Sequence, residues 1–249
     1  MSGHSKWATI KRKKAKVDAA KGAVFAKYSR EITVAAKLGG ADLNGNFRLR
    51  TAIEKAKAEG LPADNIKRAV EKAINSSGGD NLEDINYEGY GPGGVAILIE
   101  CMTDNRNRTA GDIRSYFSKN NGNLGENGCV GWMFKEVGLI TIEKAGKSQE
   151  DLFDIAINAG AEDFEEDEDC YKITTTPETL QKVAENIEKA GITVDGAERT
   201  RMPENTINVT DEGIAKFLLR LLDSIENHDD VQNVYANFEI DDDILEKLA

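Results

Sequence analysis

The spacing of apolar residues changes period along the chain. Between about residues 18 and 75, apolar side chains recur every three or four positions, which is the spacing of one helix face. Glycine-containing breaks and a Leu-Pro step interrupt the pattern, so it predicts three helices over about 18–38, 46–60 and 63–75, the first capped by Asp18. Amphipathic helices with short connections predict a small bundle over residues 17–78.

From about residue 95, short apolar runs of the kind found in strands alternate with helix-like segments. The predicted strands are 95–102, 129–134, 139–142, 170–174, 206–209 and 234–239, with another after 192–194; the predicted helices are 109–120, 150–158, 177–190 and 214–226. Between about residues 136 and 204 we infer the order β-α-β-β-α-β, which is typical of a split, ferredoxin-like fold. The βαβ patterns on either side predict the two halves of one further domain.

These elements predict an α+β fold, in which a three-helix bundle precedes two two-layer α/β domains of ferredoxin-like type, one inserted in the other. The expected parts are a basic arm at 1–16, the bundle at 17–78, a discontinuous middle domain at 79–135 and 205–240, and an inserted acidic domain at 136–204. Two independent two-layer domains remain an alternative.

Charge is distributed very unevenly, although the chain as a whole carries a formal net charge of -12. Residues 1–75 contain 17 Lys and Arg against 7 Asp and Glu, whereas residues 76–249 contain 15 against 37. A polyanion would therefore be attracted to one part of the molecule and repelled by the rest. Any contact with nucleic acid should be local and oriented.

The N-terminal arm is the sharpest feature of the sequence. Its cations, continued along the first predicted helix, are Lys6, Lys11, Arg12, Lys13, Lys14, Lys16, Lys21, Lys27 and Arg30. If six to eight of them neutralise phosphates, the salt dependence of binding should have a log-log slope of roughly -5 to -7. Trp7, which lies among them, could stack on an unpaired base. The alternative is that Trp7 covers the bundle and the cations are only solvated.

A second candidate site lies in the loop before the helix predicted at 109–120. The stretch from Thr109 to Asp112 matches a capping box, and Arg106 and Arg108 immediately precede it. Free N–H groups at a helix start, beside two arginines, favour a phosphate. The alternative is that both arginines pair with Asp104, Asp112 or the acidic domain and merely fix the loop.

Other patterns argue against several kinds of chemistry. The stretch GYGPGG at 89–94 precedes a strand rather than a helix, so it indicates a tight turn and not a dinucleotide loop. The acidic run at 162–169 lacks the spacing of a calcium loop and is interpreted as a solvated face. His4 and the surface-like His228 form no catalytic group with Ser, Cys or Asp. We therefore expect no catalytic residues, no metal site and no cofactor.

The cysteines and the hydropathy pattern bear on the compartment. Cys101, Cys129 and Cys170 are widely spaced, which fits a reducing compartment, and the first two lie in apolar runs typical of buried positions. The longest uncharged apolar run, 93–99, is far shorter than the ~20 residues of a membrane helix. The basic N-terminus lacks the apolar segment of a secretory signal. We therefore expect a cytoplasmic protein with no membrane partner.

Many stretches together resemble the YebC family of bacterial proteins, over essentially the whole chain. They are GHSKW at 3–7, KKAKVD at 13–18, AKLGG at 36–40, RLR at 48–50, YEGYGPGG at 87–94, TDNRNRT at 103–109, GNLG at 122–125, GAED at 160–163 and DDVQNVY at 229–235. The resemblance implies three domains around a cleft. It also implies that His4, Lys6, Trp7 and the lysines after them belong to the family's arm, and Arg106 and Arg108 to its central loop.

The family resemblance supports two functions, because its members are named probable DNA-binding transcriptional regulators while relatives are linked to translation and to stalled ribosomes. We expect a non-catalytic regulator of gene expression that binds nucleic acid, with DNA-binding transcription regulation as the first interpretation. The alternative is a ribosome-associated translation factor that binds rRNA through its arm and touches ribosomal proteins. An enzyme, such as a nuclease or hydrolase, is the weakest hypothesis, because no set of acid, base, nucleophile or metal ligands can be assembled. We also expect no small-molecule substrate.

Overall fold

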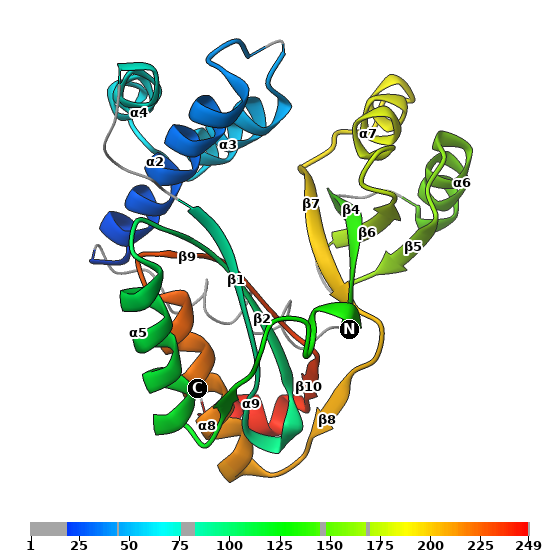
Figure 1. Ribbon diagram of the computed structural model, residues 1–249. Helices are drawn as coiled ribbons and strands as arrows, with labels where there is room; N and C mark the ends of the chain where they lie inside the picture. Colours follow the sequence, from blue (N-terminus) through cyan, green and yellow to red (C-terminus); the bar gives the residue numbers. More distant parts are fainter. Residues whose placement is uncertain (1–18, 44, 76–82, 145–147, 168–169, 249) are drawn as a thin grey trace. The chain divides into compact units, whose positions relative to one another are not determined.

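The computed structural model describes residues 19–43, 45–75, 83–144, 148–167 and 170–248. The protein is a mixed α+β chain: a three-helix region is followed by two four-stranded antiparallel sheets with helices (Figure 1). It divides into two compact units, one at 133–204 and the other combining residues up to 132 with those from 205 onward. The first unit thus lies, along the chain, between the two parts of the second.

The N-terminal region contains α2 (Ala19–Gly39), α3 (Phe47–Ala58) and α4 (Ala63–Asn75), close to the predicted ranges. Asn46 explains the sharp turn between the first two helices. Its Oδ1 accepts the N–H of Leu49 at 3.0 Å and caps α3, while its Nδ2 donates to the carbonyls of Ala35 and Gly40. The buried stripes of the three helices form one core of Ile32, Ala35, Ala36, Leu49, Ala52, Ile53, Ala56, Leu61, Ile66, Ala69 and Ala73. Asp18, the expected cap of the first helix, lies outside the described residues.

The same unit contains a sheet with the order β3-β1-β2-β9, formed by β1 (Glu83–Tyr90), β2 (Ala96–Thr103), β3 (Asn123–Leu124) and β9 (Val231–Ala236). Helices α5 (Arg106–Lys119) and α8 (Glu212–Glu226) contact each other and pack on this sheet (Figure 1). Strand β9 comes from the part of the chain after the unit at 133–204, so this sheet combines residues from before and after that unit. The core between the layers includes Ile97, Ile99, Ile113, Phe117, Leu218, Leu222 and Val234.

Two glycine-dependent features shape the hairpin between β1 and β2. Gly93 and Gly94 have φ near +75° in the short helix η1 (Pro92–Gly94), a conformation that favours glycine. Gly89 is needed for space, since a Cβ there would lie 2.6 Å from the carbonyl of Asn123 on β3. The GYGPGG stretch is thus a turn leading into a strand, as predicted.

Two strands of this unit differ from the prediction. β1 was not predicted, because its few apolar residues are separated by polar ones and by Gly89. The strand predicted at 129–134 is instead a turn followed by η2 (Gly131–Met133), and the next strand begins at Phe134. Cys129 is consequently only partly buried, whereas Cys101 is buried as expected and its burial raises the thiol pKa to about 12.

The predicted strand at 234–239 is divided at Asn237. The Asn237 side chain accepts the N–H of Ala96 at 2.7 Å and donates to the carbonyl of Asn205, so the chain changes partner there. Beyond it, β10 (Phe238–Ile240) pairs in parallel with β8 (Ile207–Val209), and α9 (Asp242–Leu248) follows. The Asn237 side chain thus takes the place of one ladder acceptor, for the N–H of Ala96, while the Asn237 backbone carbonyl accepts from Ile207 instead.

The unit at 133–204 contains β4 (Phe134–Glu143), α6 (Gln149–Ala159), β5 (Asp163–Glu166), β6 (Cys170–Thr175), α7 (Leu180–Lys189) and β7 (Gly196–Pro203). Its antiparallel sheet has the order β5-β6-β4-β7, and α6 and α7 cover one face through a core that includes Ile140, Leu152, Ile173, Val183 and Ile187. Part of the acidic run predicted as a solvated face is the edge strand β5. Phe164 points to the core from this strand, while Asp163 and Glu165 are exposed.

Candidate nucleic-acid interface

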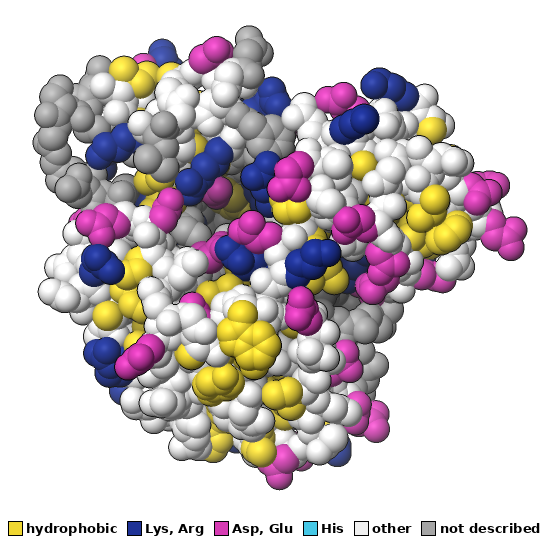
Figure 2. Space-filling model, turned by 45° about the vertical axis from the view of Figure 1, so that its right-hand side comes forward, with side chains coloured by type: hydrophobic (Ala, Val, Ile, Leu, Met, Phe, Trp, Pro, Cys, Tyr) yellow, Lys and Arg dark blue, Asp and Glu magenta, His cyan; other side chains and the backbone are white. Residues whose placement is uncertain are grey.

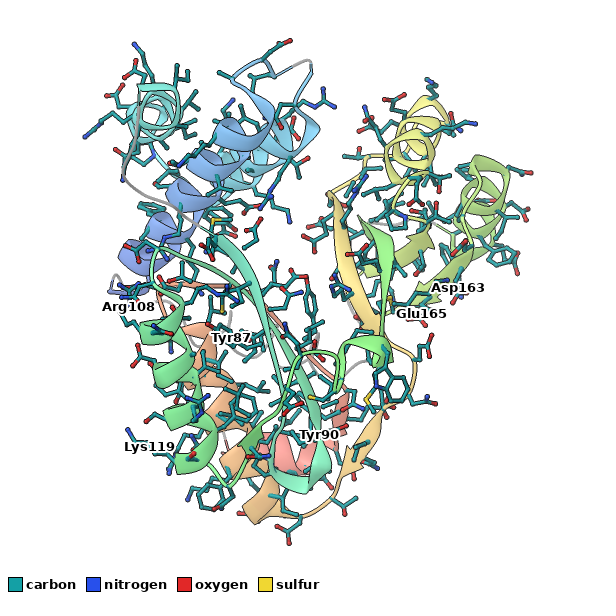
Figure 3. All side chains as sticks on the ribbon, viewed as in Figure 1. Tyr87, Tyr90, Arg108, Lys119, Asp163 and Glu165 are labelled. Carbon is teal, nitrogen blue, oxygen red and sulfur yellow. The ribbon has the colours of Figure 1, made fainter. Side chains whose placement is uncertain are left out.

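The start of α5 differs from the capping box predicted at Thr109. Asn105 is the cap, since its side chain accepts the N–H of Arg108 at 3.1 Å, and the helix begins at Arg106. Asn is at least as good a cap as Thr, so the earlier start is favoured. Arg106 and Arg108 therefore belong to the first turn of α5 rather than to the loop before it. Figure 3 shows Arg108 near this end of α5 and Lys119 near the other.

One buried carboxylate organises the residues around this helix start. Asp230, just before β9, has a side chain only 3% exposed. Its Oδ2 accepts hydrogen bonds from Thr109 Oγ1 at 2.7 Å, Arg108 Nη2 at 2.9 Å and Thr103 Oγ1 at 3.0 Å. Its Oδ1 accepts from Arg30 Nη1 at 2.8 Å. Asp230 therefore joins residues that are far apart in the sequence.

The pKa of Asp230 follows from these contacts. Burial alone would raise it, but the hydrogen bonds from Arg108, Thr109 and Thr103, with the charge of Arg30, hold the pKa at about 2. The hydrogen bonds that Arg108 donates to Asp230 and Asp104 in turn raise the Arg108 pKa. The carboxylate and the guanidinium are thus both charged at neutral pH.

Lys27 and Arg30 of α2 are engaged on protein acceptors. Arg30 Nη1 also donates to the backbone carbonyl of Asp229 at 2.6 Å, and Lys27 Nζ donates to the backbone carbonyl of Glu226. These contacts tie the helical region to the segment between α8 and β9. Arg30 retains 25% of its side-chain exposure. Two residues predicted to bind nucleic acid therefore also position α2.

Arg106 and Arg108 of α5 both form ion pairs, but only the pair between Arg108 and Asp104 was named in the alternative interpretation. Arg108 Nη2 lies 2.8 Å from Asp104 Oδ1 as well as bonding Asp230, and Arg106 Nε lies 3.7 Å from Glu83 Oε2. Both side chains remain well exposed, at 48% for Arg108 and 65% for Arg106. Asp112 instead pairs with His228.

His228 is mostly buried, so its expected surface position is wrong. The side chain is 10% exposed, with Nε2 3.2 Å from Asp112 Oδ2, and Nδ1 accepts the backbone N–H of Asp230 at 3.1 Å. Because Nδ1 is an acceptor, the neutral ring carries its proton on Nε2. A polar cavity of about 550 Å³ is lined by Arg30, Arg108, Asp112, Tyr116, His228 and Asp230, among others.

The remaining predicted residues are outside what the structure describes. They are His4, Lys6, Trp7, Lys11, Arg12, Lys13, Lys14 and Lys16; Lys21 lies on α2, but its side chain is not described. The structure thus brings together Arg30 and Arg108, while the arm itself stays a prediction from the sequence. Sequence reasoning missed Asp230, Thr103 and Thr109 as a group, because only the fold brings β2, α5 and β9 together.

Basic and acidic side chains alternate on the surface drawn in Figure 2, so that face is not uniformly cationic. Among the described residues there is no cluster of His, Cys, Asp and Glu suited to a metal ion. None of the helices in the described ranges is long and apolar enough to cross a bilayer.

A second buried carboxylate holds the loop before η2. Glu88 on β1 is 7% exposed and accepts the backbone N–H groups of Gly128, Val130 and Gly131 at 2.6–2.8 Å. The loop leads into η2, which carries Trp132, a side chain that is 69% exposed. The carboxylate therefore substitutes for regular backbone pairing in a segment that forms no strand.

Glu88→Gln should lower the free energy of unfolding by about 2 kcal/mol, because one carboxylate oxygen becomes an amide that faces N–H donors. The loop should also become more sensitive to proteolysis. Urea unfolding and limited proteolysis of the purified chain would measure both effects. Glu126→Gln, at an exposed position of the same loop, is the control and should change neither. Equal behaviour of the two variants would contradict the role given to Glu88.

Comparison with known proteins gives a consistent result over the whole chain. The family described as "TACO1/YebC protein N-terminal domain" matches residues 5–76, and "TACO1/YebC second and third domain" matches residues 82–238. A probable transcriptional regulatory protein of Desulfotalea psychrophila is 55% identical over 249 residues, covering all of both chains. Another, from Geobacter sulfurreducens, is 52% identical over 248 residues, again covering all of both chains.

A solved structure supports the same relationship. The crystal structure of a conserved hypothetical protein from Aquifex aeolicus is 46% identical, with a TM-score of 0.84, and the match covers 93% of this chain and 95% of that one. The family matches, the full-length relatives and this structure agree with the motifs recognised in the sequence. The chain therefore belongs to the TACO1/YebC family.

Proposed function

We propose that the chain is a non-catalytic, cytoplasmic regulator of gene expression that binds nucleic acid through its N-terminal arm. The observation that carries this proposal is the division of charge: six Lys and Arg lie between residues 6 and 16, while residues 76–249 are strongly acidic. So dense a group of cations favours a polyanionic partner. The names of the close relatives, probable transcriptional regulatory proteins, support DNA as the first candidate target.

The fold assigned to the acidic unit has a supporting role in this proposal. We infer that residues 136–204 form a ferredoxin-like domain inserted into a middle domain of 79–135 and 205–240, because β9 pairs with β2. The excess of Asp and Glu in residues 136–204 would repel a polyanion and leave the arm as the point of attachment.

A second candidate function, binding of ribosomal RNA by a translation factor, is favoured by a specific observation. Arg106 and Arg108 on α5 are held in ion pairs with Glu83, Asp104 and Asp230, so this helix is poorly suited to reading base edges. A cationic arm with one Trp suits irregular RNA, where bases are unpaired. In this case the acidic surfaces would face basic ribosomal proteins.

Crosslinking in cells, followed by sequencing of the attached nucleic acid, tests the proposal and separates its two forms. Enrichment of promoter DNA would support transcription regulation, and enrichment of ribosomal RNA would support the ribosome. Binding of the purified chain to either polymer should also follow a log-log salt slope of roughly -5 to -7. The absence of any crosslinked nucleic acid above background would refute both forms.

Trp7→Ala should weaken binding to single-stranded RNA more than binding to duplex DNA. A stacked base contributes about 1–3 kcal/mol, and unpaired bases are available in the RNA but not in the intact duplex. Fluorescence anisotropy with one sequence in both forms measures the difference. Trp132→Ala, which alters an exposed Trp remote in sequence from the arm, is the matched control. Equal losses on RNA and DNA would rule out stacking by Trp7.

A further inference from the structure

A polar cleft between α2 and α4 carries positively charged residues that the sequence reasoning did not select. The cleft has a volume of about 490 Å³. Its polar lining from the two helices consists of Ser29, Arg30, Thr33, Asn65, Arg68 and Lys72. On α4, residues 65, 68 and 72 follow the three- and four-residue spacing of one helix face, so their side chains line the same wall.

The charges that line this cleft are predominantly positive. They are Arg30, Arg68 and Lys72 with one carboxylate, Asp104; Arg30 pairs with Asp230 and Asp104 with Arg108, so Arg68 and Lys72 supply the charge of the α4 wall. Of the other α4 charges, Glu71 pairs with Lys67 at 3.8 Å and neither lines the cleft. The cleft therefore has the charge that an anionic group requires.

The groups in the cleft are also arranged for hydrogen bonding. Arg68 is exposed, and its guanidinium is oriented along α4 by contacts from Nη2 to Asn65 Oδ1 at 3.1 Å and from Nε to the carbonyl of Asp64 at 3.3 Å. These two contacts use two of the five N–H groups of the guanidinium, and a guanidinium fork suits phosphate oxygens. Thr33 is held by bonds from Oγ1 to the carbonyls of Ser29 and Ala69.

The position of the cleft indicates which anion it would take. Its α2 wall spans two helical turns, from Ala26 to Thr33, of the helix that directly follows the basic arm in the sequence. The cavity around Asp230 shares Arg30 and Asp104 with this cleft, but it adds three carboxylates, Asp112, Asp229 and Asp230, beside Arg108, so the cationic lining ends at the cleft. A chain of phosphates bound by the arm could therefore continue along α2 as far as Arg68 and Lys72.

We propose that the α2–α4 cleft is a second nucleic-acid contact, in which Arg68 and Lys72 bind the phosphodiester backbone of a strand whose first contact is the arm. This inference rests on the proposed function, because it requires that the arm bind nucleic acid. The inference extends that function, because it predicts that the bound strand runs from the arm to the α2–α4 cleft. The site reads phosphates and not bases, so it should accept RNA and DNA alike.

The test uses the full-length chain carrying Arg68→Ala and Lys72→Ala together. The probes are a fluorescein-labelled 20-nucleotide single-stranded RNA, its RNA duplex and the corresponding DNA duplex, titrated over a series of KCl concentrations. Loss of two phosphate contacts should make the log-log salt slope less steep by about 1.8 on duplex DNA and about 1.4 on the single strand. Binding should weaken on all three probes.

The matched control is Lys57→Ala with Lys67→Ala, which removes the same charge from exposed positions of α3 and α4 outside the cleft lining. Circular dichroism and thermal unfolding establish that both double variants are folded. If the cleft variant and the control have the same affinity and salt slope, the inference is overturned while the proposed function stands. If the unaltered chain shows no salt-dependent binding to any probe, the proposed function fails and the inference fails with it.

Discussion

Deletion of residues 1–16 is expected to abolish binding to nucleic acid while leaving the fold intact. The segment contains six of the 17 Lys and Arg in residues 1–75, and removing six phosphate contacts should reduce the log-log salt slope on duplex DNA by about 5. At moderate salt this corresponds to a loss of several orders of magnitude in affinity. The three described core clusters begin no earlier than Phe25, so the truncated chain should unfold at the same temperature.

Anisotropy titrations at low and moderate KCl measure the affinity, and thermal unfolding in parallel measures the unfolding temperature. A second variant replaces the six cations by Gln and keeps the length of the arm and Trp7. This variant should lose affinity almost as completely, because the charge and not the length of the arm drives association. Unchanged affinity of the truncated chain at low salt would refute the arm as the binding element.

Asp230→Ala is expected to destabilise the unit that contains it by about 3 kcal/mol. The change removes the acceptor of four hydrogen bonds and leaves Arg30 and Arg108 beside an uncompensated, largely buried site. Both arginines are partly exposed and can regain some hydration, which places the effect at the lower end for buried ion pairs. Urea unfolding in a Trp7→Phe background, with Trp132 as the fluorescent reporter, measures it.

Asp229→Ala is the matched control, since the side chain of Asp229 is exposed and its backbone carbonyl, which accepts from Arg30, is retained. It should change the free energy of unfolding by less than about 0.5 kcal/mol. A similar loss in both variants would show that Asp230 has no special role.

The free energy of unfolding of the wild type should also fall in acid, because the Asp230 carboxylate becomes protonated. The Asp230→Asn variant has no carboxylate there and should not lose this contribution. The Asp230 pKa is about 2 in the folded chain, below the ordinary value of an unfolded Asp near 3.9. Its ionisation therefore contributes stability above about pH 4, and this contribution is lost as the pH falls toward 2. Because the side chain is buried, the shift corresponds to about 2 kcal/mol. Parallel pH profiles of wild type and Asp230→Asn would reveal no difference if the carboxylate were not involved.

The sequence by itself determined the helical region, most of the two α/β regions and the division of charge. Repeated apolar spacing is local, and helices α2, α3, α4, α6 and α8 accordingly lie within a few residues of their predicted ranges. The arm is likewise predicted from its composition alone, because charge density needs no tertiary information. β1 was missed because Gly89 and polar residues dilute its alternation, and the glycine is explained by the Asn123 backbone and the Phe117 ring, which the tertiary structure brings against it.

The tertiary structure alone decided which polar residues act together. Asp230 meets Arg30 and Arg108 because β9 returns to pair with β2, a contact between segments more than 100 residues apart. Tertiary packing also pairs Arg106 with Glu83 and places Arg68 and Lys72 on the wall of a cleft. Local sequence patterns fix periodicity and charge, whereas the partner of a buried charge depends on long-range strand pairing, which no local pattern encodes.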